Sequence, residues 1–273
     1  MEGGITIHLA PSALAYIGDF AVTNTLITAI TVSILLVAFA FFAGRSLRLK
    51  PSGFQVVLES LIALPYEFVR DTLGNDRLAE RLFPLVMSIF MFVLAVNWFG
   101  LLPFVATFGP AEGAHGLVPL FYPGATDLNL TLALTVIAFL AIEIAGIVTL
   151  GMFRYAGKFI NFTSPLAFAI GLIELFSELA RLLSFSFRLF GNIFAGKVLI
   201  LVVMFFIPLI VPIPFLAFEI FVGFIQAAIF ALLTLFFVKI AIESHGEHSE
   251  EETRHPETDG ASLPRRTIIN TVS

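Results

Sequence analysis

Eight ionisable residues stand inside long apolar stretches of the chain or at the edges of those stretches. They are Asp127, Glu143, Glu174, Glu178, Arg181, Arg188, Lys197 and Glu219. A charge at the centre of a bilayer costs about 2.5–3.5 kcal/mol on insertion scales, so such residues usually mark ion paths or pair with one another. Acids and bases at these depths predict ion translocation, although Arg181 and Glu143 are explained equally well as paired structural ions.

Polar side chains recur in the segment 165–207, mostly at steps of three or four residues. They are Glu174, Ser177, Glu178, Arg181, Ser184, Arg188 and Asn192. Residues three or four apart share one face of an α-helix, so these side chains form one polar stripe on an otherwise apolar rod. The stripe predicts an ion path that this helix lines but does not complete by itself.

The composition places the chain in a membrane. It is 58% hydrophobic and only 13% charged, with a mean hydropathy of +0.98, whereas soluble domains carry about 25% charged residues. The absence of cysteine excludes disulfides, thiol catalysis and cysteine-ligated metals. The five histidines lie outside the apolar stretches without metal-ligand spacing, and the net charge of −5 gives no reason to expect a nucleic-acid partner.

Five apolar runs are long enough to cross the roughly 30 Å of hydrocarbon in a bilayer. They cover 23–44, 83–108, 127–152, 165–207 and 215–238. We therefore expect an all-α polytopic membrane protein with about five transmembrane helices in a single membrane domain, 23–243. Residues 1–22 form an outside segment before it, and 244–273 form an acidic tail expected to be disordered on the inside.

Two segments depart from a simple span. Residues 53–73 alternate apolar and charged positions at helical spacing, which predicts an amphipathic helix on the membrane surface, bent at Pro65. The run 165–207 would be about 64 Å long as one helix, about twice the hydrocarbon thickness. It must therefore be steeply tilted, or broken near Gly171, Gly191 or Gly196.

The positions of lysine and arginine predict the orientation. These residues gather between the first two spans, after the third and after the fifth, and are absent from 1–22, 109–126 and 208–214. The positive-inside rule then places the N-terminus outside and the C-terminus in the cytoplasm, which suits a bacterial inner membrane.

The segment SFSFRLFGNIFAG (184–196) resembles the signature of subunit a, the membrane stator subunit of F-type ATP synthases. Three further features match that family in the same order: NWFGLLP (97–103), ATDLNLT (125–131) and Gln226 on the final helix. The resemblance covers roughly residues 20–243.

This resemblance implies a protein without a catalytic site or cofactor of its own. In the family, two offset half-channels carry protons to and from carboxylates on a rotating ring of c subunits, and ATP chemistry belongs to other subunits. Arg188 matches the stator arginine that prevents a proton short-circuit, and a guanidinium suits this role because it stays charged. The implied partners are the c-subunit ring, the peripheral-stalk b subunits, the rest of the complex and membrane lipid.

The remaining candidate residues divide between the two half-channels. Asn192 matches the channel asparagine of the family. The outer half-channel would use Asp127, Asn129, Glu219 and Gln226. The inner half-channel would use Glu174, Ser177, Glu178 and, judged from its depth in the third span alone, Glu143.

Lys197 is the main departure from the family pattern. The position after Ala195-Gly196 usually holds His or Glu, paired with Glu or His on the last helix. Here Lys197 stands opposite Glu219, and we expect the two to form a neutralising ion pair in the outer half-channel.

Two other classes of protein remain open at this point. A stand-alone ion channel or proton-coupled carrier would show internal repeats and work without partners. An intramembrane enzyme would need clustered histidines or a nucleophile–base pair within the spans, and no histidine lies within them.

Overall fold

The computed structural model describes residues 11–48, 53–102, 105, 119–159, 164–208 and 210–243. The predicted tail, the first ten residues, most of the loop 109–126 and all five histidines lie outside these described residues.

The described chain is almost entirely helical. Its elements are β1 (Ala13–Ile17), β2 (Phe20–Thr23), α1 (Asn24–Arg45), α2 (Gly53–Leu73), α3 (Asp76–Phe99), the short 3-10 helix η2 (Gly124–Thr126), α4 (Leu128–Leu150), α5 (Met152–Phe159), α6 (Pro165–Phe206) and α7 (Pro212–Glu243). Five of them, α1, α3, α4, α6 and α7, are long and apolar enough to cross a membrane. The expected all-α class is confirmed, and the chain is an integral membrane protein.

Polar residues cap the starts of four of the long helices. Thr23, Asn75, Asp127 and Ser164 each precede a helix, and each side chain accepts a hydrogen bond from a backbone N–H of the first turn. Such caps satisfy donors that the helix itself leaves free. Asp127 therefore has a structural task in addition to any role in ion transfer.

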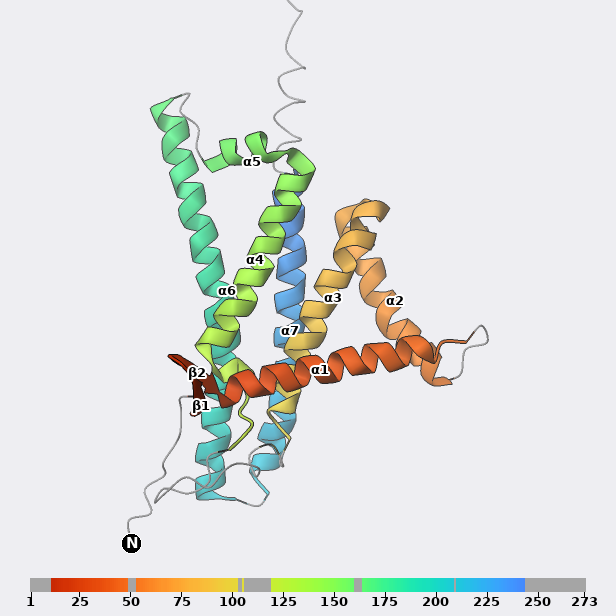
Figure 1. Cartoon of the computed structure of the whole chain (residues 1–273), viewed down its shortest axis with the longest axis vertical. Helices are drawn as coiled ribbons and strands as arrows, with labels where there is room; N and C mark the ends of the chain where they lie inside the picture. Colours follow the sequence, from red (N-terminus) through yellow and green to blue (C-terminus); the bar gives the residue numbers. More distant parts are fainter. Residues whose placement is uncertain are drawn as a thin grey trace, which may run out of the picture.

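The helix α6 is continuous over its 42 residues, so the second of the two expected alternatives, a break at a glycine, does not occur. It is about 63 Å long, twice the hydrocarbon thickness, and it packs against α7 and α4. In Figure 1, α1 runs across the long axes of α4, α6 and α7 instead of alongside them. If α1 crosses the bilayer along the membrane normal, the axes of α6 and α7 are steeply tilted from that normal.

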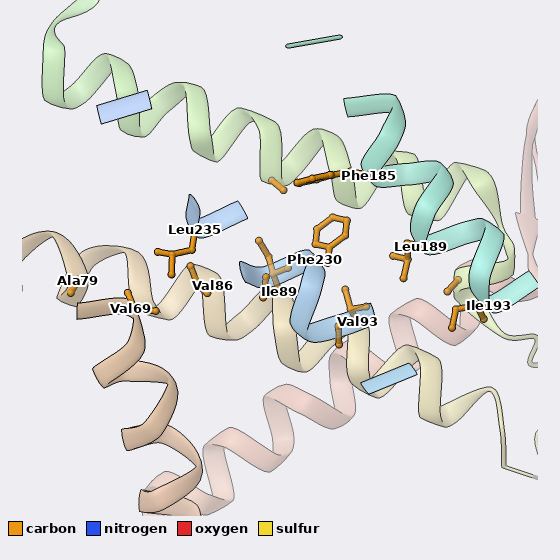
Figure 2. Close-up of a cluster of buried hydrophobic side chains, with 14 residues drawn as sticks. Val69, Ala79, Val86, Ile89, Val93, Phe185, Leu189, Ile193, Phe230 and Leu235 are labelled. Carbon is orange, nitrogen blue, oxygen red and sulfur yellow. The ribbon is translucent and has the colours of Figure 1, made fainter. Parts of the chain in front are cut away.

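The main core lies where α3, α4, α6 and α7 meet the end of α2 (Figure 2). Val86, Ile89 and Val93 from α3 point toward Phe230 of α7, and Phe185 of α6 closes the cluster from the other side. The ring centroids of Phe185 and Phe230 are 5.4 Å apart. Since lipid tails are as apolar as these side chains, close packing rather than exclusion from water holds the helices together.

Two elements were not expected from the sequence. The strands β1 and β2 form an antiparallel hairpin in which Ile17 pairs with Phe20, so Gly18 and Asp19 make a two-residue turn, and Gly18 has a φ of +64°. Gly-Asp between two β-branched or aromatic runs is a recognisable hairpin signal. The second unexpected element is α5, a short amphipathic helix between α4 and α6.

Candidate functional site

A pocket between α6 and α7 brings together three predicted site residues and the glycine of the Ala195-Gly196 pair. Asn192 and Gly196 of α6 and Glu219 and Gln226 of α7 line this pocket of about 440 Å³. Glu219 is 5% exposed and Gln226 is 7% exposed. Neither side chain has a hydrogen-bond partner among the described residues. The pocket has room for several water molecules, which are the natural partners for a buried carboxylate and amide.

Within this pocket, the side chain of Glu219 reaches α6 at Gly196. The carboxylate of Glu219 lies directly against the Gly196 backbone, where any Cβ would overlap it. The glycine of the Ala-Gly pair thus makes room for the acidic side chain of the neighbouring helix.

Arg188 lies on the exposed flank of α6, beside the pocket. Its guanidinium carbon is 6.0 Å from the centre of the Phe185 ring, and no described residue pairs with it through an ion pair or a hydrogen bond. Asn192, one turn further along, is also exposed. Gln226 reaches toward both, because it lines a small second pocket with Arg188 as well as the larger one with Asn192.

Contacts with α3 fix the orientation of α7 about its own helix axis. Asn97 donates its side-chain N–H to the carbonyl of Gly223 at 3.1 Å, and Trp98 donates its indole N–H to the carbonyl of Ile220 at 3.0 Å. A Cβ on Gly223 would lie 3.2 Å from that of Asn97, so the two helices touch here. The NWFGLLP segment therefore determines the direction in which Glu219 and Gln226 point.

At the other end of the site, Asp127 is held by two donors. The hydroxyl of Thr25 in α1 donates to Asp127 Oδ2 at 2.6 Å, and the backbone N–H of Asn129 donates to Oδ1 at 2.9 Å. One turn along α4, the Thr131 hydroxyl lies 3.1 Å from that of Ser186 on α6. Asp127 is buried, whereas the Asn129 side chain is exposed. A buried polar network thus connects α1, α4 and α6.

Lys197 does not form the predicted ion pair with Glu219. Its ammonium lies 3.0 Å from the centre of the Tyr122 ring, in a cation–π contact. Consecutive helical residues point about 100° apart, so Gly196 faces Glu219 while Lys197 turns toward the segment before η2. Burial raises the pKa of Tyr122, so its ring is neutral at physiological pH.

The residues predicted for the inner half-channel lie toward the start of α6. Glu178 is buried and accepts a 2.8 Å hydrogen bond from Arg181, whose guanidinium carbon lies 4.0 Å from the centre of the Phe237 ring. Arg181 therefore has the geometry of a paired structural ion. Glu174 is half-buried and Ser177 is exposed.

Glu143 contacts a residue that the sequence did not single out. Tyr155 on α5 is buried, and its ring packs so closely on Gly146 that a Cβ there would overlap it. Burial raises the pKa of Tyr155, and the nearby carboxylate of Glu143 raises it further. The structure thus joins Glu143 to the short helix between α4 and α6.

Comparison with known proteins decides the family. The family model described as ATP synthase A chain matches residues 25–239. The chain belongs to the ATP synthase subunit a family. ATP synthase subunit a of Gloeobacter violaceus is 36% identical over 225 residues, covering 82% of this chain and 86% of the relative. That of Moorella thermoacetica is 30% identical over 240 residues, covering 87% and 99%, and that of Campylobacter fetus is 34% identical over 225 residues, covering 82% and 92%.

Four side chains in this member of the subunit a family were missed by sequence reasoning, although each contacts a predicted site residue or its network. They are Thr25, Tyr122, Tyr155 and Ser186. Threonine, tyrosine and serine are common in membrane helices and loops, so their types alone carry no signal. Only the spacing of Tyr155 in the amphipathic segment after α4 could have drawn attention to it.

Proposed function

We propose that this protein is the membrane stator subunit of a proton-driven rotary ATP synthase. In this role it supplies two offset half-channels to a c-subunit ring and has no catalytic chemistry of its own. The observation that carries the proposal is the unpaired guanidinium of Arg188 on an exposed flank of the membrane-length helix α6. A permanent cation in such surroundings needs an anionic partner, and no described residue supplies one.

A carboxylate on a rotor would be that partner. The charge of Arg188 would attract the ionised carboxylate and favour its deprotonation as it passes. Because a guanidinium keeps its proton, it would also block direct proton transfer along α6. Four exposed positions lie within about 40° of Arg188 around the helix: Ser177, Ser184, Asn192 and Ala195. We call these four residues and Arg188 the arginine flank.

The two half-channels would reach opposite sides of Arg188. The α6–α7 pocket with Asn192, Glu219 and Gln226 would form the inner end of the outer path, approached past Asp127 and Asn129. Lys197, held against Tyr122, would contribute positive charge beside that path.

The inner path would begin at Glu174, Ser177 and Glu178, with Glu143 behind them. Glu174 is fourteen residues from Arg188, about 21 Å along the helix axis. The half-channels are thereby offset along α6, and a proton would have to ride on the ring between them.

Other chains of the synthase would then cover the rest of the molecule. The c-subunit ring would pack on the arginine flank, and the peripheral-stalk b subunits would bind elsewhere. The outside N-terminus, the cytoplasmic C-terminus and a bacterial inner membrane belong to the same proposal.

The rotor contact can be tested by reversible crosslinking, since the chain contains no native cysteine. Ser184→Cys or Ala195→Cys, paired with a cysteine on the outer helix of the c ring, should form a disulfide under oxidation. The crosslink should stop ATP-driven proton pumping in membrane vesicles, and a reductant should restore it, because the ring can then turn again.

Leu183→Cys is the matched control. This residue is 49% exposed on the same helix but points about 140° away from Arg188. It should crosslink weakly and leave pumping intact. Equal crosslinking at positions 183 and 184, or pumping that continues through the crosslink, would contradict the rotary role and favour a stand-alone channel or carrier.

A further inference from the structure

The carboxylate of Asp127 is buried, yet two hydroxyl groups connect it to a partly exposed position. Asp127 is 6% exposed, and its Oδ2 accepts a 2.6 Å hydrogen bond from the hydroxyl of Thr25, a residue that is 1% exposed. The Thr25 hydroxyl lies 2.9 Å from that of Thr23. Thr23 is partly exposed, where the hairpin β1–β2 passes into α1 (Figure 1). The three side chains therefore form one line of hydrogen-bonded oxygen atoms that ends at the buried carboxylate.

The direction of each hydrogen bond in this line follows from the partners of each oxygen. Thr25 donates its proton to Asp127, because an ionised carboxylate can only accept. Thr23 must then be the donor in its contact with Thr25, and its oxygen also accepts the backbone N–H of Leu26 at 3.3 Å. The line thus runs from Thr23 through Thr25 to Asp127, with every hydroxyl donating in the same direction.

Other contacts hold the start of α1 against the segment before α4. Asn24 donates its side-chain N–H to the carbonyl of Pro119 at 3.4 Å, and the hydroxyl of Thr28 accepts the backbone N–H of Tyr122 at 3.1 Å. Asn24 and Thr28 are both buried. The docking of α1 therefore does not depend on the Thr25 hydroxyl alone.

We propose that Thr23 and Thr25 relay protons between the water on the outer side and Asp127. This inference rests on the proposed function, in which Asp127 belongs to the outer half-channel. A hydroxyl group can donate one proton while it accepts another, so the line can carry protons to a carboxylate that is almost closed to water. The start of α1 then forms the entrance of that half-channel.

Each transfer replaces one O–H bond with another. A hydronium ion in the outer water gives a proton to Thr23 Oγ, Thr23 releases its own proton to Thr25 Oγ, and Thr25 releases its proton to Asp127 Oδ2. Three O–H bonds break and three form, the hydronium ion becomes water, and the carboxylate becomes neutral. Once Asp127 has passed the proton on, rotation of the two hydroxyl groups restores their first directions. During ATP-driven pumping the same steps run in reverse.

Removing the Thr25 hydroxyl tests the relay. Thr25→Val keeps the shape of the side chain, and we expect proton-driven ATP synthesis and ATP-driven pumping per assembled complex both to fall about tenfold or more. Thr25→Ser keeps the hydroxyl and should retain most of both activities. Thr135→Val is the matched control and should stay near normal. Thr135 is also 1% exposed, but its hydroxyl donates to the carbonyl of Thr131 in its own helix.

Thr25→Ala distinguishes a relay from a bond that only fastens α1 to α4. The shorter side chain leaves about one water volume, and a water there would have the oxygens of Thr23 and Asp127 as partners. If the relay is correct, this water replaces the hydroxyl, and Thr25→Ala should be several-fold more active than Thr25→Val. A purely structural bond predicts the opposite order, because valine keeps the packing whereas alanine leaves a cavity.

Thr23 provides a second test outside the buried region. Thr23→Val should lower both activities as Thr25→Val does, and Thr23→Ser, which keeps both the hydroxyl and the helix cap, should not. This pair decides the question if Thr25→Val does not assemble.

Normal activity in Thr25→Val or Thr23→Val would overturn the relay, and so would a Thr25→Ala variant no more active than Thr25→Val. Arg188→Ala in the same vesicles separates this inference from the proposed function. If Arg188→Ala is inactive while Thr25→Val is as active as Thr135→Val, only the relay fails. Coupled activity that survives Arg188→Ala would count against the proposed function itself.

Discussion

Replacing Arg188 with alanine should abolish coupling without preventing assembly. Arg188 is exposed and pairs with no described residue, so its loss leaves no buried partner unsatisfied and the fold should persist. We expect ATP-driven proton pumping and proton-driven ATP synthesis both to fall by about 100-fold or more, a size typical of removing a preorganised charge. Both activities can be measured in membrane vesicles that carry the variant complex. An immunoblot of the subunits checks that the complex has assembled.

The conservative variants sharpen this prediction. Arg188→Lys should lose most of the coupling as well, because an ammonium in apolar surroundings can release its proton whereas a guanidinium does not. Arg181→Lys is the matched control on the same helix, since it retains a cation beside Glu178. Coupling that survives Arg188→Ala would show that the arginine is structural and that the charge barrier lies elsewhere.

Gly196→Ala should lower the rate of proton translocation while leaving the complex assembled. The added methyl group would overlap the carboxylate of Glu219, which is the end of a flexible side chain and can swing aside. The helix gains propensity from alanine, about 1 kcal/mol relative to glycine, so we expect the complex to assemble. The displaced carboxylate should lower the rate of proton translocation about tenfold or more, because position decides transfer between neighbouring groups. Pumping rates at equal complex content measure the effect.

Shortening the acidic side chain provides the rescue. In the double variant Gly196→Ala with Glu219→Asp, the shorter side chain leaves room for the methyl group, so its activity should exceed that expected from the two single variants. Residues in contact are commonly non-additive in this way. Gly44→Ala is the control, since its methyl group would meet no atom within 4 Å. Additive losses would mean that Gly196 acts on something other than Glu219.

The sequence predicted the parts of the fold that depend on local pattern. Long apolar runs and their caps are local features, so the five membrane-length helices could be found without knowledge of their partners. The stripe on α6 was visible for the same reason, because helical spacing alone brings Arg188 and Asn192 to one flank.

Features that depend on two elements at once were harder to predict. The predicted ion pair between Lys197 and Glu219 was wrong. Predicting the partner of Lys197 requires the rotation of α6 relative to α7, and residue spacing within one helix does not give that rotation. The contacts of Thr25 with Asp127 and of Tyr155 with Glu143 join elements from different parts of the chain. Such contacts follow from tertiary packing, and no property of a single segment encodes them.

The polar contacts at the start of α1 also constrain the order in which the protein is built. Asn24, Thr25 and Thr28 bond to groups that lie 94 to 102 residues later in the chain. The ribosome therefore delivers α1 to the membrane well before its partners exist, and contacts so distant in sequence are slow to form. Although α1 is synthesised before α4, it is expected to dock late, after the start of α4 has been inserted.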